Sequence, residues 1–248
     1  MWEAFARKVQ LVFEDETLRK RILFVLGALI VFRLLAAIPI PGINSAELAA
    51  FLSNNQFFGL LDVFSGGGFS TLSIVMLGVG PYITSSIVMQ LLTVLVPSLK
   101  EMYQEEGDAG RQRFMLYSRY LALPLAFIQA FGFLLLLQQN GIVPALTLLG
   151  LVTNVTVIAA GSILLMWIGE LISEFGIGNG VSLLIFAGIV ARIPRDLSQL
   201  AFSFDVSQLP ALIGFIAAAA IITAGVVYIS EAERPIPVTY ARRVRGMK

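Results

Sequence analysis

The sequence predicts an all-α protein that crosses a membrane several times. Of its 248 residues, 57% are hydrophobic and 13% are charged, and this charged share is roughly half of the 25% or so that soluble domains carry. The apolar residues gather in runs, and crossing a bilayer takes about 20 such residues. Glycine and proline stand at the ends of these runs. We therefore expect a polytopic helix bundle surrounded by lipid.

Six spans are predicted, in the order in which the apolar runs occur. The first is interrupted only by Arg33 and ends before Pro39 and Pro41, neither of which can donate a helical hydrogen bond. The second follows a broken apolar stretch and ends before Pro97, and the fifth is the shortest. The predicted spans cover residues 22–38, 71–96, 114–137, 152–172, 177–193 and 209–229.

The positions of the basic residues predict the orientation. Arg192 and Arg195 are the basic residues of the predicted outer segments, Arg33 lies within the first span, and the remainder of the 17 Lys and Arg residues lies in the predicted inner segments. Cytoplasmic loops are enriched in Lys and Arg. We therefore place the N-terminal segment 1–21 and the tail 230–248 in the cytoplasm, with 194–229 as an outer loop and the sixth span.

Composition excludes most catalytic chemistry. The chain has no Cys and no His, which removes thiolate and imidazole metal sites and the nucleophile triads that need a histidine. The glycine-rich run 176–180 is followed by no Lys-Ser or Lys-Thr pair, so it is no phosphate-binding loop, and a tight inner turn entering a helix is the better account. We predict no enzyme, no metal and no cofactor.

The broken stretch 57–75 has two interpretations. It contains Asp62, three consecutive glycines and several Ser and Thr residues. Irregular backbone at membrane depth is tolerated only inside protein or against a water-filled cavity. The stretch is either a re-entrant segment in a pore mouth, hinged at 66–68, or an ordinary amphipathic outer helix followed by a loop. Spacing alone leaves both open.

Two isoleucines of the second span point to a possible constriction. Ile83 and Ile87 are four residues apart and share one helix face, beside the polar residues Ser85, Ser86 and Gln90. An apolar face of this kind can gate a pore by dewetting. Plain helix–helix packing through small residues is the commoner arrangement in membranes.

Two of the ionisable residues inside predicted spans stand out, Arg33 and Glu170. Such residues usually face the protein interior or water. Arg33 lies near the outer end of the first span and Glu170 near the inner end of the fourth. We interpret both as side chains that extend toward the nearer membrane surface.

Four motifs, in order, resemble those of the SecY family. They are IPIPG at 38–42, LLDVFSGGGFSTLSI at 60–74, LGVGPYITSSIVMQLL at 77–92 and GIGNGVSLLIFAGIV at 176–190. RPIPVTYARRVRG at 234–246 is similar to the start of the large cytoplasmic loop after the family's sixth span. The resemblance covers essentially the whole chain, and it is the combination of the motifs that makes it specific.

The resemblance implies a fold and a set of site residues. The family fold has ten spans in two inverted halves, so residues 22–193 would be the first five-span half. Residues 60 to about 73 would be a plug helix that closes the outer funnel. The span 77–96 would form one side of the lateral gate. The apolar pore ring would include Ile83, Ile87, Val181 and Ile185. The plug positions are Leu60, Leu61, Asp62, Val63, Phe64, Ser65, Gly66, Gly67 and Gly68.

The resemblance also implies function and partners. The chain would be a pore-forming subunit of the Sec translocase in a prokaryotic plasma membrane, passing unfolded polypeptides that carry signal sequences. SecE and SecG-like small subunits would accompany it, with the SecA motor or a ribosome docked at Arg242, Arg243 and Arg245. Six spans of about ten indicate an incomplete channel. A secondary solute transporter is the alternative, since transporters also use broken helices.

Overall fold

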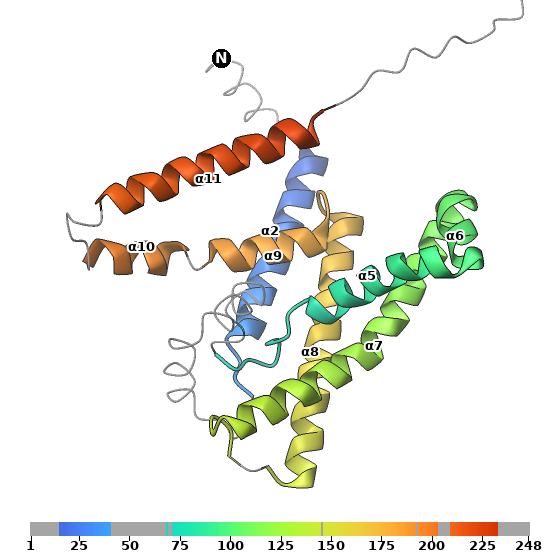
Figure 1. Cartoon of the computed structure of the whole chain (residues 1–248), viewed down its shortest axis with the longest axis horizontal. Coiled ribbons are helices and arrows are strands. Elements are labelled where there is room, and N and C mark those ends of the chain that lie inside the picture. Colours follow the sequence, from blue (N-terminus) through green and yellow to red (C-terminus); the bar gives the residue numbers. More distant parts are fainter. Residues whose placement is uncertain are drawn as a thin grey trace, which may run out of the picture. The chain divides into compact units, whose positions relative to one another are not determined.

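The computed structural model describes residues 15–40, 68, 71–144, 146–191, 193–202 and 209–232. Within these ranges the chain is helical apart from turns and one isolated β-bridge, so the predicted all-α class is confirmed. The chain divides into two compact units, Met1–Arg195 and Asp196–Lys248, and the candidate site lies in the first (Figure 1). The helices are α2 (Glu16–Ala36), α5 (Gly80–Leu95), α6 (Pro97–Gln104), α7 (Gly107–Gln139), α8 (Leu148–Phe175), α9 (Gly180–Val190), α10 (Ile193–Phe202) and α11 (Leu209–Ser230).

Each of the six predicted spans contains one helix, but the helices differ in length. By length and composition, α7, α8 and α11 are able to cross a membrane, and α5 with α6 passes the same test when the two are joined across a 112° bend. The bend falls at Pro97, the first residue of α6. Helix α9 has 11 residues, and at about 1.5 Å per residue it is shorter than a bilayer core.

The helix boundaries differ from the predicted spans and loops at three places, for identifiable reasons. Helix α2 begins six residues before the predicted span because Asp15 caps it, its carboxylate accepting the Thr17 N–H at 2.8 Å. The predicted outer loop after the fifth span contains α10, which ends at Phe202. Residues 71–79, predicted as the start of the second span, form turns, since Leu72 (φ +44°) and Gly78 (φ +58°) have left-handed backbones that an α-helix does not contain.

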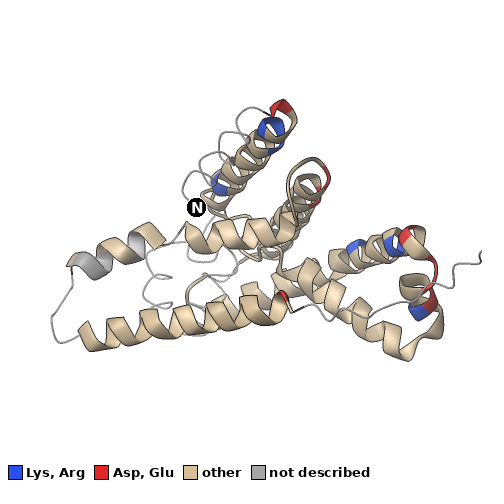
Figure 2. Cartoon of the chain, turned by 90° about the horizontal axis from the view of Figure 1, so that it is seen from above, with Lys and Arg blue, Asp and Glu red and all other residues tan. Residues whose placement is uncertain are grey.

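Charged residues are concentrated toward the helix ends (Figure 2). Figure 2 shows long stretches of helix without Lys, Arg, Asp or Glu, and short stretches where both signs gather. The connection around α6 and the start of α7 carries such a cluster, including the exposed Arg113–Glu106 pair at 3.8 Å. This distribution is typical of helices whose middle sections contact hydrocarbon.

The interior of the first unit consists of two hydrophobic clusters, and the irregular segment 71–79 contributes to both. Leu72 and Met76 pack into one cluster, while Val75 and Val79 pack into the other. Helix α8 also supplies both clusters. In space, α5 and α7 run side by side and α7 lies along α8, whereas α5 and α8 have little direct packing (Figure 1). The other members of the first cluster are Ile40, Ala130, Leu134, Leu137, Ile142, Val143, Val155 and Ile158, and those of the second are Phe32, Ala36, Leu165, Ile168, Ile172 and Leu184.

Candidate functional site

Most residues of the irregular segment 71–79 are buried although its backbone is not helical. Leu72, Val75 and Met76 are each at most 1% exposed. An unpaired backbone group in hydrocarbon costs several kcal/mol, so a segment of this kind needs protein partners for its N–H and C=O groups. The structure supplies these partners from two directions, the end of α2 and the middle of α8.

The residues after α2 provide the first set of partners. The Ile40 N–H donates to the Leu72 carbonyl at 2.8 Å, and the Ile74 N–H donates to the Ile38 carbonyl at 3.0 Å. The Thr71 hydroxyl donates to the Ala36 carbonyl at 2.9 Å. The chain therefore leaves the end of α2 and returns to the same place about 30 residues later, held by backbone bonds at both ends.

Helix α8 provides the second set through two adjacent small residues. The buried Ser162 hydroxyl donates to the Gly78 carbonyl at 2.6 Å. A Cβ atom at the neighbouring Gly161 would overlap the Ile74 carbonyl oxygen, so the absence of a side chain there lets the irregular segment lie directly on α8. Close approach through small residues is the usual way in which membrane helices pack.

The turn between α8 and α9 fixes α9 with the same kind of contact. A Cβ at Gly180 would overlap the Gly169 carbonyl oxygen of α8, and the Gly180 N–H donates to the Ser173 hydroxyl at 2.8 Å. Asn179 caps α9 by accepting the Ser182 N–H at 3.0 Å. The glycine-rich run 176–180 is thus a tight turn into a helix, as the sequence indicated.

Three of the four predicted ring residues lie around one hydrophobic cluster. Ile83 from α5 and both Val181 and Ile185 from α9 are partly buried and pack against the second cluster. Ile87 is 50% exposed. Side chains from helices nearly 100 residues apart in the sequence therefore share one apolar centre. Their role as a pore ring stays a prediction.

The other predicted site residues are mostly outside the described ranges. Of the plug segment 60–73, the structure describes Gly68 and residues 71–73. The docking residues Arg242, Arg243 and Arg245 also lie outside the described residues. The C-terminal end of the plug segment is thus described where it joins the bundle, and the plug itself stays a prediction.

Sequence reasoning missed a polar junction between three helices. Glu170 of α8 forms an ion pair with Arg119 of α7, so our interpretation of Glu170 as a side chain that extends toward the membrane surface was wrong. One residue earlier in α7, the Ser118 carbonyl accepts a hydrogen bond from the buried Ser85 hydroxyl of α5. The signal that could have revealed this pair is the presence of opposite charges near the inner ends of two consecutive spans.

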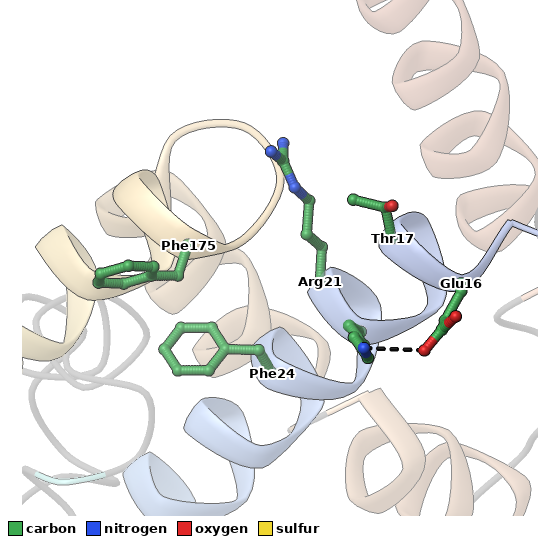
Figure 3. A pocket seen from close by; sticks show the side chains of 6 residues that line it. Glu16, Thr17, Arg21, Phe24 and Phe175 are labelled. Atoms are coloured by element: carbon green, nitrogen blue, oxygen red, sulfur yellow. Dashed lines mark ion pairs between the residues drawn. The ribbon is translucent and has the colours of Figure 1, made fainter.

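An open pocket of 550 Å³ lies where α2 begins and α8 ends. Figure 3 shows Phe24 and Phe175 facing one another across it, with ring centroids 6.0 Å apart in an edge contact. Lys20 pairs with Glu16 at 2.8 Å on its rim. In the part of the chain that the structure describes, no group of three or more Asp and Glu residues is placed to hold a metal ion.

These observations define a polytopic α-helical membrane protein with an irregular segment buried inside its bundle, and comparison with known proteins names its family. The SecY family model matches residues 73–248. The translocase subunit SecY of Mycobacterium tuberculosis is 41% identical over 245 residues, covering 93% of this chain and 55% of that protein. The corresponding subunit of Synechocystis is 40% identical over 237 residues, covering 93% and 53%. The chain belongs to the SecY family.

Two solved structures share the fold. Sec61 in the canine ribosome–channel complex from the endoplasmic reticulum matches with a TM-score of 0.57 and 22% identity, covering 90% of this chain and 50% of that one. A protein-conducting channel matches with a TM-score of 0.56 and 21% identity, covering 83% and 47%. The resemblance drawn from the four motifs is confirmed. The chain spans about half the length of the curated relatives that it matches.

Proposed function

We propose that the chain is part of the pore-forming subunit of a Sec protein translocase, which passes unfolded polypeptides across or into a membrane. The observation that carries this proposal is membership of the SecY family, whose curated members are named protein translocase subunits. The buried irregular segment supports it, because backbone of this kind is tolerated at membrane depth inside protein or beside a water-filled cavity.

An apolar ring suits a polypeptide better than it suits an ion. An ion filter needs carbonyl or charged groups that replace the hydration shell, whereas Ile83, Val181 and Ile185 offer only hydrocarbon. Apolar side chains bind no peptide sequence strongly, yet they close around chains of varied shape and limit ion leak. In this account Ile83 and Ile87 on α5, with Val181 and Ile185 on α9, form the ring.

The plug would provide a second seal. Residues 60–73 would close the outer funnel and move aside when a signal sequence parts the lateral gate, of which α5 is one side. The bonds from the irregular segment to Ala36, Ile38 and Ile40 would hold the plug's base in place while the segment between them moves.

Energy and docking would come from partners, because the proposed mechanism includes no covalent step. The Arg242, Arg243 and Arg245 cluster would lie on a cytoplasmic loop that docks the SecA motor or a ribosome. SecE and SecG-like small subunits would complete the complex. With the N-terminus cytoplasmic and the membrane a prokaryotic plasma membrane, this loop would face the site of protein synthesis. The comparisons give no support to the solute-transporter alternative.

Reconstitution tests this proposal. A full-length channel that carries this sequence is placed in vesicles with SecE, SecG-like subunits and SecA. We expect ATP-dependent protection of a signal-sequence-bearing polypeptide from added protease, and we expect none when SecA or the signal sequence is omitted. Uptake of small solutes by the same vesicles without SecA, together with no polypeptide protection, would contradict the translocase and favour a transporter.

A further inference from the structure

The Arg119–Glu170 ion pair lies where three helices meet. Its two facing atoms, Arg119 Nε and Glu170 Oε1, are fully buried, and neither has another hydrogen-bond partner among the described residues. The Glu170 side chain as a whole is 19% exposed and that of Arg119 is 41% exposed. Among the described residues, each of the two facing atoms therefore has the other as its partner.

Such a pair is poorly explained as a general source of stability. The free-energy cost of removing two charges from water offsets much of the attraction between them. Well-packed apolar residues in their place often stabilise the folded protein as well or better. Ionisable residues within membrane spans are expensive and tend to be retained for a specific role. What a partly buried pair does provide is a single arrangement of the two helices, because removing either partner leaves the facing charge without its partner.

The contacts around the pair connect the two sides of the proposed ring. Ile83 is on α5, and α5 is bonded to α7 by the Ser85 hydroxyl at the Ser118 carbonyl. The adjacent residue of α7, Arg119, pairs with Glu170 of α8. One residue before Glu170, Gly169 lies against the start of α9.

The other side of the ring begins immediately after that contact. Val181 follows Gly180, which packs on α8, and Ile185 lies one turn further along α9. The residues just before α5 are bonded to α8 by the Ser162 hydroxyl at the Gly78 carbonyl, which fixes the first turn of α5. Direct packing between the rest of α5 and α8 is slight, so the direction in which α5 runs past Ile83 depends also on how α7 is fixed to α8.

We propose that the Arg119–Glu170 ion pair is a positioning device that fixes α7 on α8 and thereby sets how tightly the α5 and α9 sides of the apolar ring close. The ring itself rests on the proposed function. Arg119 and Glu170 act through the helices, so both are positioning residues that set the resting width of the channel.

Spin-label distances test the positioning independently of transport. The sequence contains no Cys, so cysteines are introduced at Leu91 of α5 and Phe186 of α9, which are 63% and 61% exposed and are not ring residues. Double electron–electron resonance then gives the distance distribution between α5 and α9 in a full-length channel. We expect Arg119→Gln and Glu170→Gln to broaden it and to shift it to longer distances, and Arg119→Lys to leave it close to wild type.

A matched control breaks an exposed ion pair on the same helix. Arg113 of α7 pairs with Glu106 at 3.8 Å, with side chains that are 69% and 45% exposed, and exposed pairs contribute little. Arg113→Gln is expected to leave the distances unchanged. If Arg119→Gln, Glu170→Gln and Arg113→Gln all give the wild-type distribution, the positioning role is wrong.

Ion leak through the resting channel separates this proposal from the proposed function. We expect Arg119→Gln to raise leak roughly tenfold, the change that about 1.4 kcal/mol of lost closure energy gives, and the exchange Arg119→Glu with Glu170→Arg to restore much of the seal. Altered distances with wild-type leak would support the positioning and contradict the ring. If Arg119→Gln and Glu170→Gln keep the wild-type distances between α5 and α9, the positioning role is overturned, whatever ion leak these variants show.

Discussion

Replacing Ile83 with Asn in a full-length channel is expected to raise resting ion leak by an order of magnitude or more. Ile83 is partly buried against the second hydrophobic cluster, so an amide there introduces a polar group into the proposed constriction. A constriction that gates by dewetting loses its barrier when a polar side chain stabilises water within it. The same change should let a polypeptide with a defective signal sequence pass. Conductance across a planar bilayer and a translocation assay measure the two effects.

The position along α5 provides the controls for this result. Ile87 shares the helix face of Ile83, and Ile87→Asn should raise leak in the same direction. Val88, one residue further on, is turned by about 100°, and Val88→Asn should leave leak near wild type. Wild-type leak and wild-type signal-sequence stringency in both isoleucine variants would show that these residues form no ring.

A single methyl group at Gly161 is expected to destabilise the whole bundle. In Gly161→Ala the new Cβ would overlap the Ile74 carbonyl oxygen, which belongs to a buried backbone and cannot rotate away as a side chain does. Overpacking of this kind typically costs about 1–3 kcal/mol. The hydrogen bond from Ser162 to Gly78 would lengthen as the two segments separate. We expect a melting temperature several degrees lower in detergent.

Gly132 provides the matched control for Gly161. It lies in α7, and a Cβ there meets nothing within 4 Å. Gly132→Ala should therefore be neutral or slightly stabilising, since alanine favours a helix by up to about 1 kcal/mol over glycine. Equal melting temperatures for Gly161→Ala and the wild type would mean that α8 and the irregular segment are not in close contact.

Sequence patterns predicted the helices well and the irregular segment poorly. Residues 72–79 are apolar and continuous with the second span, so periodicity alone gives no sign that the helix begins only at Gly80. Tertiary contacts keep the residues before Gly80 out of the helix. These contacts are the hydrogen bonds from the residues after α2 and the bond from Ser162, and they accompany left-handed backbones at Leu72 and Gly78. Partners of this kind are distant in the sequence, and one sequence does not identify them.

The candidate ring residues were predicted mainly from the family motifs, and only partly from residue spacing and chemistry. Ile83 and Ile87 were suggested by their shared helix face, but Val181 and Ile185 entered only through the resemblance. That Ile83, Val181 and Ile185 pack around one cluster depends on how α8 turns into α9. The Arg119–Glu170 pair was missed because Arg119 was counted only with the basic residues of the inner segments, while Glu170 was considered alone and has an acceptable solvent-facing explanation when its partner is not known.

The central claim is that Ile83 and Ile185 line the path of a polypeptide, and photo-cross-linking tests it most directly. A photoreactive phenylalanine is placed at Ile83, at Ile185, or at Trp167, an aromatic residue of α8 that is 57% exposed, in a full-length channel holding a stalled polypeptide. The account predicts adducts with the polypeptide from Ile83 and Ile185 and none from Trp167. Polypeptide adducts absent from both isoleucine positions, or equally strong from Trp167, would contradict it.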